Sequence, residues 1–117
     1  MTGIHPERRR YPRIQKELPL KLTTDDYDLV TQTKNISCIG AYCAVDRYIA
    51  PLTKLSILLL LPLQSKNRIT TTKVQCKGVV VRTEQSLPAG FNIAIFFNEI
   101  GERDKKKIAK YVSQHIL

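Results

Sequence analysis

The chain has 117 residues, enough for one domain with a single hydrophobic core. Hydrophobic residues make up 43% of it and charged residues 25%, a balance that excludes a disordered chain. Its 19 lysines and arginines exceed its 10 acidic residues, and the excess is concentrated in residues 1–16 and 101–117. Taken in bulk, such a charge is typical of proteins that bind nucleic acids or membrane surfaces.

Several classes of protein are excluded by what the sequence lacks. No apolar run is longer than that of Ile57 to Leu61, which is far shorter than the roughly 20 residues that a transmembrane helix needs. No apolar stretch follows the first charges, as it would in a secretory signal. The three cysteines show no Cys-x-x-Cys spacing, which argues against a disulfide scaffold and against a zinc site (Cys38, Cys43 and Cys76). We therefore expect a cytoplasmic protein with no transmembrane segment, no metal and no cofactor.

Residues 1–16 are polar and basic and show no hydrophobic periodicity, so we expect a flexible arm with no apolar side chain to bury. Strand-like patterns begin after the arm, where Leu18, Leu20 and Leu22 alternate with polar residues. The cluster of Asp25, Asp26 and Asp28 predicts a turn rather than a calcium loop, because no distal glutamate follows it. The patterns predict strands at about 18–23, 28–36, 41–45, 55–61, 67–82 and 91–97, with a turn at 35–40.

Two of these strands carry particular expectations. The run Leu55 to Leu61 between two prolines is apolar except for Ser56, which predicts a strand buried on both faces and ended by Pro62. Gly78 inside the fifth strand indicates a bend or a close approach of another backbone. In the last strand Phe91, Ile93, Ile95 and Phe97 alternate on one face, and the three phenylalanines Phe91, Phe96 and Phe97 all belong to this predicted core strand.

The end of the chain changes periodicity. Ile108, Tyr111, Val112, His115 and Ile116 fall on one face of a helix, with the lysines mostly on the others. Six strands followed by one helix predict a mainly β fold, an antiparallel barrel or sandwich. The expected division is an arm at 1–16, a β body at 17–100 and a helix at 101–117.

The first motif with chemical content lies in the arm and reads Arg8-Arg9-Arg10-Tyr11-Pro12-Arg13. Arginines at i and i+4 can converge on one anion, and Pro12 keeps the arm extended. A guanidinium pairs with phosphate oxygens and with the O6 and N7 edge of guanine. Alone, this motif is explained at least as well by a basic tail that attracts anions without specificity.

The second motif is Asn35-Ile36-Ser37-Cys38-Ile39-Gly40. Asn35 and Ser37 are two positions apart, so in a strand they face the same side and offer an amide and a hydroxyl to a base or a phosphate. Gly40 permits a positive φ angle or a close approach of a ligand. Alone, this segment is an ordinary polar turn. One hairpin fits between the two motifs, so the chain can bring them together.

The ordered pair Arg9-x-x-x-Arg13 and Asn35-x-Ser37-x-x-Gly40 resembles the signature of the PilZ domain family. The late strand pair, Lys77 to Arg82 and Gly90 to Phe97, is similar to the closing strands of that family. The resemblance covers nearly the whole chain from about Arg8. It implies a six-stranded, antiparallel, Greek-key-like β-barrel with a C-terminal α-helix.

The resemblance also implies a function, binding of the bacterial second messenger cyclic di-GMP. By position, Arg9 and Arg13 would contact phosphates and the Hoogsteen edge of guanine, and Asn35, Ser37 and Gly40 would form the guanine-binding turn. Arg8 corresponds to an arginine that the family associates with two stacked ligand molecules. Arg82 is a further candidate, although a solvated charge near a strand end is the simpler interpretation.

The expected protein is a non-catalytic receptor in a bacterial cytoplasm that changes conformation on binding and so regulates a downstream effector protein of unknown identity. No base is paired with a nucleophile in the sequence, so we do not expect an enzyme. Two alternatives remain open. One is a basic β-barrel that binds single-stranded nucleic acid, and the other is a PilZ-type interaction protein that binds no nucleotide.

Overall fold

The computed structural model describes residues 11–116. Six strands precede one helix, in the predicted order: β1 (Pro19–Thr23), β2 (Asp28–Ser37), β3 (Gly40–Val45), β4 (Lys54–Ser65), β5 (Arg68–Gln85), β6 (Phe91–Glu99) and α1 (Glu102–Gln114). Every strand pair is antiparallel. In this part of the chain α1 is the one helix, and it is too short and too polar to cross a membrane.

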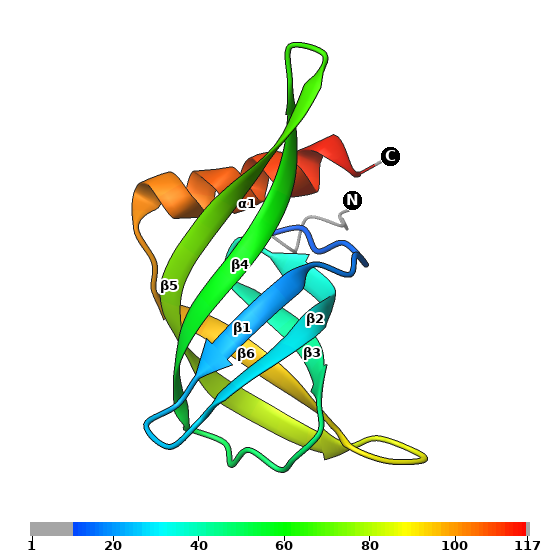
Figure 1. The fold of residues 1–117 in the computed structure, drawn as a ribbon, viewed down its shortest axis with the longest axis vertical. Helices are drawn as coiled ribbons and strands as arrows, with labels where there is room; N and C mark the ends of the chain where they lie inside the picture. Colours follow the sequence, from blue (N-terminus) through cyan, green and yellow to red (C-terminus); the bar gives the residue numbers. More distant parts are fainter. Residues whose placement is uncertain (1–10, 117) are drawn as a thin grey trace, which may run out of the picture.

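The strands form a closed barrel in the order β1-β2-β3-β6-β5-β4 (Figure 1). β3 pairs with β6 rather than with β4, the strand that follows it, and β1 pairs with β4 to close the ring. The predicted mainly β fold, a Greek-key-like antiparallel barrel with a C-terminal helix, is confirmed. Of the two architectures that periodicity allowed, the sandwich is excluded because the hydrogen-bonded ring has no open edge.

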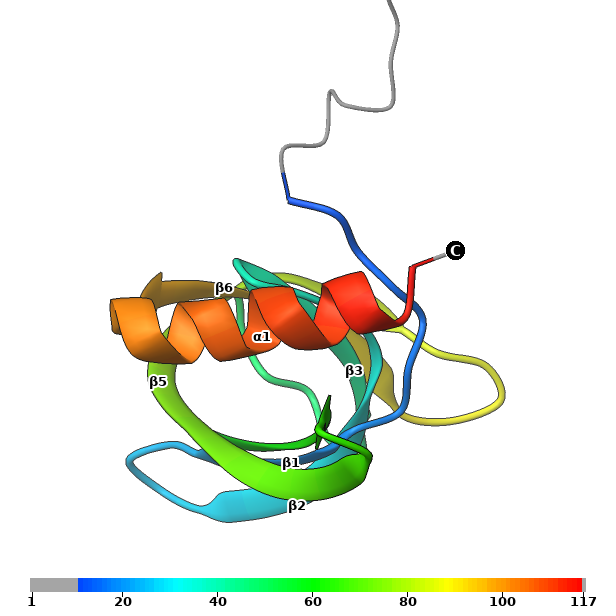
Figure 2. The same cartoon turned by 90° about the horizontal axis from the view of Figure 1, so that it is seen from above.

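Alternation of side chains builds the core. Leu18, Leu20 and Leu22 are at most 3% exposed, as their spacing predicts, and Ile93, Ile95 and Phe97 meet them from β6. Seen from above, α1 lies across one end of the barrel (Figure 2). It buries three side chains against the core, Ile108, Tyr111 and Val112. Each aliphatic or aromatic side chain removed from water in this way contributes about 1.5–3 kcal/mol before chain entropy is subtracted.

The prediction for β4 is wrong in two respects. The strand alternates, so that Leu55, Ile57, Leu59 and Leu61 are buried whereas Ser56 is exposed and Leu58 and Leu60 are half-buried on the outer face. It also continues through Pro62 to Ser65. Beyond Leu59 β4 pairs with β5 alone, so its other edge is free of strands. The N–H of Gln64 points to that free edge and donates to the side chain of Gln114 in α1. Pro62 lies two residues earlier, so its nitrogen faces the same edge. No strand there needs a backbone donor, and the proline is therefore tolerated.

β5 is the longest strand and carries two irregularities. It extends to Gln85, three residues beyond the predicted end, and its register with β6 shifts between Lys77 and Val79 and again between Val80 and Arg82. Gly78 lies at the first shift. A Cβ there would lie 3.0 Å from the backbone carbonyl oxygen of Phe96, which confirms the predicted close approach of another backbone, and it would also meet the side chains of Ile95 and Ile57 at 2.7 and 2.8 Å.

The helical face is shorter than its periodicity predicts. α1 ends at Gln114, His115 is its C-cap, and Ile116 is 45% exposed instead of buried. The three cysteines are free, as expected: Cys38 and Cys43 are buried and Cys76 is half-buried. Burial raises the pKa of both Cys43 and Cys76 to about 12, so these thiols are protonated near neutral pH.

Candidate functional site

A pocket of about 290 Å³ lies on the outer wall of the barrel, over β2, β3, β5 and β6. Four residues of the two sequence motifs line it, namely Arg13, Asn35, Ser37 and Gly40. The remaining lining residues are mostly apolar: Ile39, Ala41, Tyr42, Val81, Arg82, Ala94, Ile95 and Phe96. The structure thus brings together residues that are more than 20 positions apart in the sequence. The two other predicted site residues, Arg8 and Arg9, lie outside the described residues.

Arg13 is positioned by its neighbour Ile14. Ile14 and Ile36 form a two-way backbone bridge in which each N–H donates to the other carbonyl at 3.0 Å. Ile36 stands between Asn35 and Ser37, so this bridge sets the arginine beside the polar turn. Ile14 also packs against the core, and the expectation that the arm has no apolar side chain to bury is therefore wrong at this position.

A second anchor holds the chain just after the arm. The hydroxyl of Thr33, which is 1% exposed, donates to the carbonyl of Lys16 at 2.5 Å and accepts the N–H of Leu18 at 2.9 Å. The N–H of Thr33 itself donates to the carbonyl of Leu18 at 3.0 Å. Sequence reasoning missed this residue, because a threonine in a strand is ordinary and nothing local marks it as an anchor.

Replacing Thr33 with valine is expected to lower the free energy of unfolding by about 1–3 kcal/mol, because the N–H of Leu18 loses its buried acceptor while the shape is kept. The same change loosens the segment that positions Arg13. Urea denaturation measures the effect, with Thr71→Val, a change at an exposed strand position, as the matched control. Equal stability of the two variants would show that Thr33 is not an anchor.

The polar turn is tighter than predicted. Asn35 and Ser37 belong to β2 and Gly40 to β3, which leaves only Cys38 and Ile39 between the strands. The hydroxyl oxygen of Ser37 accepts the N–H of Ile39 at 3.2 Å, so its own proton is free to be donated elsewhere. Ser37 is 4% exposed and Asn35 is half-buried.

Of the two roles predicted for Gly40, a positive φ angle is not found, the close approach of a ligand stays a prediction, and the structure adds a third role. The close approach that the structure shows at this residue is that of the neighbouring strand. A Cβ on Gly40 would overlap the carbonyl oxygen of Ile95 in β6. The glycine is therefore required by the pairing of β3 with β6, whether or not a ligand is present.

Arg82, Tyr42 and Glu84 form a charged group at one wall of the pocket. The Tyr42 hydroxyl donates to Glu84 Oε1 at 2.6 Å, Arg82 Nε lies 3.0 Å from Glu84 Oε2, and the Arg82 guanidinium lies 5.8 Å from the centre of the Tyr42 ring. The hydrogen bond between Tyr42 and Glu84 raises the pKa of Tyr42 and lowers the pKa of Glu84. Arg82 is thus held in place beside the pocket. Sequence reasoning named Arg82 but missed Tyr42 and Glu84, whose contact spans 42 positions.

The pocket also has an aromatic surface. Phe96, in the predicted core strand, points outward and is 45% exposed. It follows the buried Ile95 and precedes the buried Phe97, so simple alternation turns it to the outer face. A base or another flat ring can stack on such a side chain.

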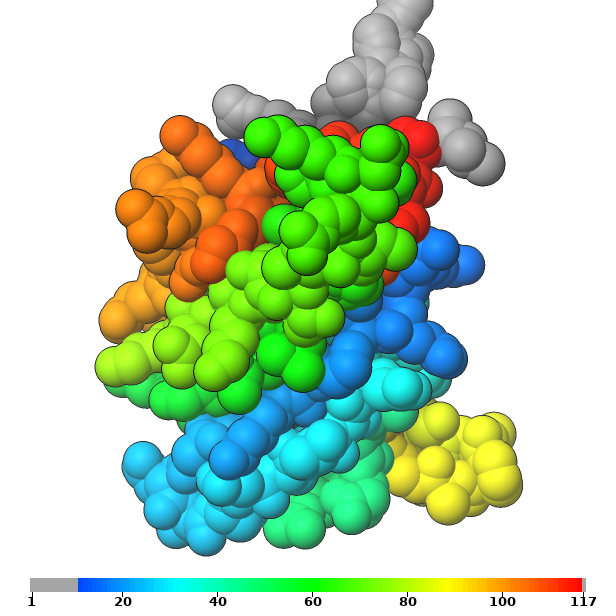
Figure 3. All heavy atoms as spheres, turned by 45° about the horizontal axis from the view of Figure 1, so that its top comes forward, coloured from blue at the N-terminus to red at the C-terminus, as the bar shows by residue number. Residues whose placement is uncertain are grey.

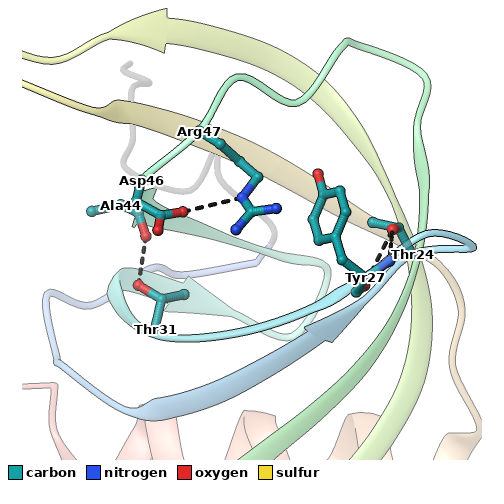
Figure 4. Close-up of polar contacts among 6 residues, drawn as sticks. All are labelled: Thr24, Tyr27, Thr31, Ala44, Asp46 and Arg47. Atoms are coloured by element: carbon teal, nitrogen blue, oxygen red, sulfur yellow. Dashed lines mark hydrogen bonds and ion pairs between the residues drawn. The ribbon is translucent and has the colours of Figure 1, made fainter.

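A second depression, of about 620 Å³, lies between the start of β2, the end of β3 and the β5–β6 turn. There Arg47 is held by Asp46 at 3.3 Å and by the ring of Tyr27, whose centre is 4.3 Å away (Figure 4). Thr24 Oγ1 accepts the N–H groups of Asp26 and Tyr27, as in the turn predicted at Asp25 and Asp26. The polar contacts drawn here stabilise two loops and join β2 to β3 through Thr31 and Ala44, whereas the polar side chains of the first pocket line an open space.

Comparisons with known proteins identify the family and the fold of the chain. The family model described as the PilZ domain matches residues 7–114. No curated protein matches the sequence.

Three solved structures share the fold. The Bacillus subtilis inhibitor of motility, MotI/DgrA, is 18% identical with a TM-score of 0.80, and the match covers 91% of this chain and 50% of that one. The PilZ domain of Escherichia coli YcgR with c-di-GMP is 10% identical with a TM-score of 0.62, covering 92% of this chain and 90% of that one. A tetrameric PilZ domain from Xanthomonas campestris is 19% identical with a TM-score of 0.52, covering 77% and 48%. The chain thus spans half the length of MotI/DgrA.

Proposed function

This chain belongs to the PilZ domain family, and we propose that it is a receptor for cyclic di-GMP that binds the nucleotide in the pocket on its outer wall. The PilZ family is a cyclic di-GMP-binding family, although some of its members bind no ligand, and PilZ domains are receptor domains that catalyse no reaction. The observation that supports ligand binding most strongly here is the convergence of Arg13, Asn35 and Ser37 on one pocket.

The chemistry of the pocket matches the parts of this ligand. Arg13 offers a planar pair of donors to a phosphate or to the O6 and N7 edge of guanine. Asn35 offers a donor and an acceptor to a base edge, and Ser37 has a free proton to donate. Phe96 offers a ring face for stacking. A pocket of about 290 Å³ is at the small end of ligand sites, so we expect it to take one guanine with an adjoining phosphate.

The remainder of the ligand is proposed to contact the arm, where Arg8 and Arg9 precede Arg13 in the sequence. A nucleotide that contacts both the arm and the barrel, on either side of the Ile14–Ile36 bridge, would stabilise one position of the arm relative to the barrel. The output is then a surface made by arm and barrel together, read by a downstream effector protein in the bacterial cytoplasm. No chemical step is involved.

Calorimetric titration of the native chain tests the proposal. We expect saturable binding of cyclic di-GMP at micromolar concentration or tighter, and an increase in stability of about 2.7 kcal/mol when the free ligand is at 100 times its Kd. No heat and no thermal shift at these concentrations would contradict the proposal and leave a PilZ-type interaction protein.

Titration with single-stranded DNA at several salt concentrations separates the remaining alternative. Binding that weakens steeply with salt and shows no preference for the cyclic dinucleotide would identify a nucleic-acid-binding barrel. The proposed receptor is expected to prefer cyclic di-GMP at every salt concentration.

A further inference from the structure

The described residues divide sharply by charge. The β4–β5 hairpin beyond the barrel and α1 together carry eight lysines and arginines against two acidic residues, Glu102 and Asp104. The rest of residues 11–116 carries eight basic residues against seven acidic ones. Four of those acidic residues lie near the turns at the opposite end of the barrel: Asp25, Asp26, Asp28 and Asp46. The molecule is therefore positive at the helix end and nearly neutral elsewhere.

The hairpin and the helix form one continuous end of the molecule. Residues 60–65 of β4 and 68–73 of β5 pair only with each other, and in Figure 1 this hairpin projects past α1. Side chains of α1 hold it: Gln114 donates to the carbonyl of Gln64 at 3.0 Å, and Lys107 donates to the carbonyl of Lys73 at 3.1 Å. Figure 3 shows the hairpin and the helix side by side at this end.

Six side chains at this end are exposed, and we call them the basic end: Lys66, Arg68 and Lys73 on the hairpin, and Arg103, Lys106 and Lys110 on α1. The three on α1 are at i, i+3 and i+7, so they share one helix face. Of the two acidic residues nearby, Asp104 is already held by Lys107 at 3.1 Å. Close to the hairpin turn, Ile69 is 71% exposed.

We propose that the basic end docks on an anionic lipid membrane, with the hairpin turn and Ile69 reaching the headgroup region. Four of its six cations are lysines, which suit the diffuse field of charged headgroups, whereas protein interfaces are enriched in aromatic residues and arginine and depleted of lysine. An apolar side chain at the tip of a basic projection adds burial to the electrostatic attraction. The acidic turns at the opposite end orient the molecule, because the same surface repels them.

The surface is separate from the pocket on the outer wall, so docking does not depend on the proposed nucleotide. Cosedimentation of the full chain with vesicles tests it. Vesicles of equal parts phosphatidylcholine and phosphatidylglycerol are expected to bind the protein, binding is expected to fall as salt rises, and vesicles of phosphatidylcholine alone are expected to leave it in solution. No binding to the anionic vesicles would overturn the proposal and favour an acidic protein as the partner.

Variants locate the surface. A basic side chain near an anionic membrane is worth about fivefold in affinity, so the triple change Lys66→Gln, Arg68→Gln and Lys73→Gln is expected to weaken binding at least tenfold. The matched control removes three exposed cations elsewhere, Lys21→Gln, Arg47→Gln and Lys54→Gln, and is expected to change binding less than twofold.

Ile69→Ser is expected to weaken binding several-fold while its salt dependence persists. Equal loss in both triple variants, each checked for a native melting curve, would overturn the proposal because net charge alone would explain the binding.

Discussion

Arg13→Ala is expected to weaken cyclic di-GMP binding about 100-fold without changing the melting temperature of the protein. Arg13 is exposed and lines the pocket, and the backbone bridge beside it is formed by Ile14, so removing the guanidinium leaves the barrel and the anchor intact. Charge-assisted hydrogen bonds are worth about 1.5–3 kcal/mol, and about 2.7 kcal/mol corresponds to 100-fold in Kd. Calorimetry of the native chain and the variant measures the change.

Two further variants make this test sharper. Arg13→Lys keeps the charge but loses the planar fork, so an intermediate affinity is expected if Arg13 makes paired hydrogen bonds. Arg68→Ala removes an exposed arginine on the β4–β5 hairpin and is expected to bind the nucleotide like the native chain. If Arg13→Ala bound as tightly as Arg68→Ala, the pocket would not be the ligand site, although the fold would be unaffected.

Gly40→Ala is expected to lower the free energy of unfolding by about 3 kcal/mol, even in the absence of ligand. The new Cβ would overlap the carbonyl oxygen of Ile95, which is backbone in the adjacent strand and has little room to move. β3 and β6 must therefore separate at the point where the pocket lies. Urea denaturation of the free protein gives the effect directly.

Gly101→Ala is the matched control, because a Cβ at Gly101 would meet nothing within 4 Å and its φ angle of −70° suits alanine. Because Gly101 is the N-cap of α1, where alanine is less favourable than glycine, the change is expected to lower stability by no more than about 1 kcal/mol, clearly less than Gly40→Ala. A Gly40→Ala variant with native stability but no ligand binding would reverse the interpretation, since the glycine would then serve the approach of the ligand and not the pairing of the strands.

The Arg13→Ala and Gly40→Ala predictions differ because Arg13 acts only in binding whereas Gly40 is also needed for the fold. Arg13 can be removed without disturbing any contact that builds the barrel, so its effect is confined to binding. Gly40 is part of the barrel itself. The pocket is thus formed from strand positions that the fold already requires, with polar side chains added on the outer face.

Much of the fold follows from local patterns. Alternation places Leu20, Leu22 and Ile93 in the core because successive side chains of a strand point to opposite faces, and this holds whatever the strand pairs with. The same rule applied to β4 would have turned Leu58 and Leu60 outward. The alternation is hard to see in this strand because the outward positions are also occupied by leucines. Leu58 and Leu60 are half-buried, so the outer face of β4 is itself partly covered.

The candidate site was accessible to sequence reasoning only in part. Asn35 and Ser37 share a face because they are two positions apart in a strand, and this needs no tertiary information. Tyr42 and Glu84 carry no such signal. Their contact exists because β3 and β5 both flank β6, with Tyr42 opposite Ala94 and Arg82 also opposite Ala94. Phe96 faces outward by alternation along β6, but only the pairing of β6 with β3 and β5 places it beside the pocket.

The sequence by itself determined the order of six strands and a helix, most of the residues that face the core, and the identity of the groups able to bind an anion and a purine. These depend on periodicity and side-chain chemistry, which are local. Only the tertiary structure decided where the basic charge lies, that Ile14 bridges Ile36 to set Arg13 beside the turn, and that Gly40 serves strand pairing. Such features depend on the register between distant strands, which is set by the packing of the whole core. Within residues 11–116 the basic excess accordingly resolves into an arginine at a pocket and a cationic end on the hairpin and helix.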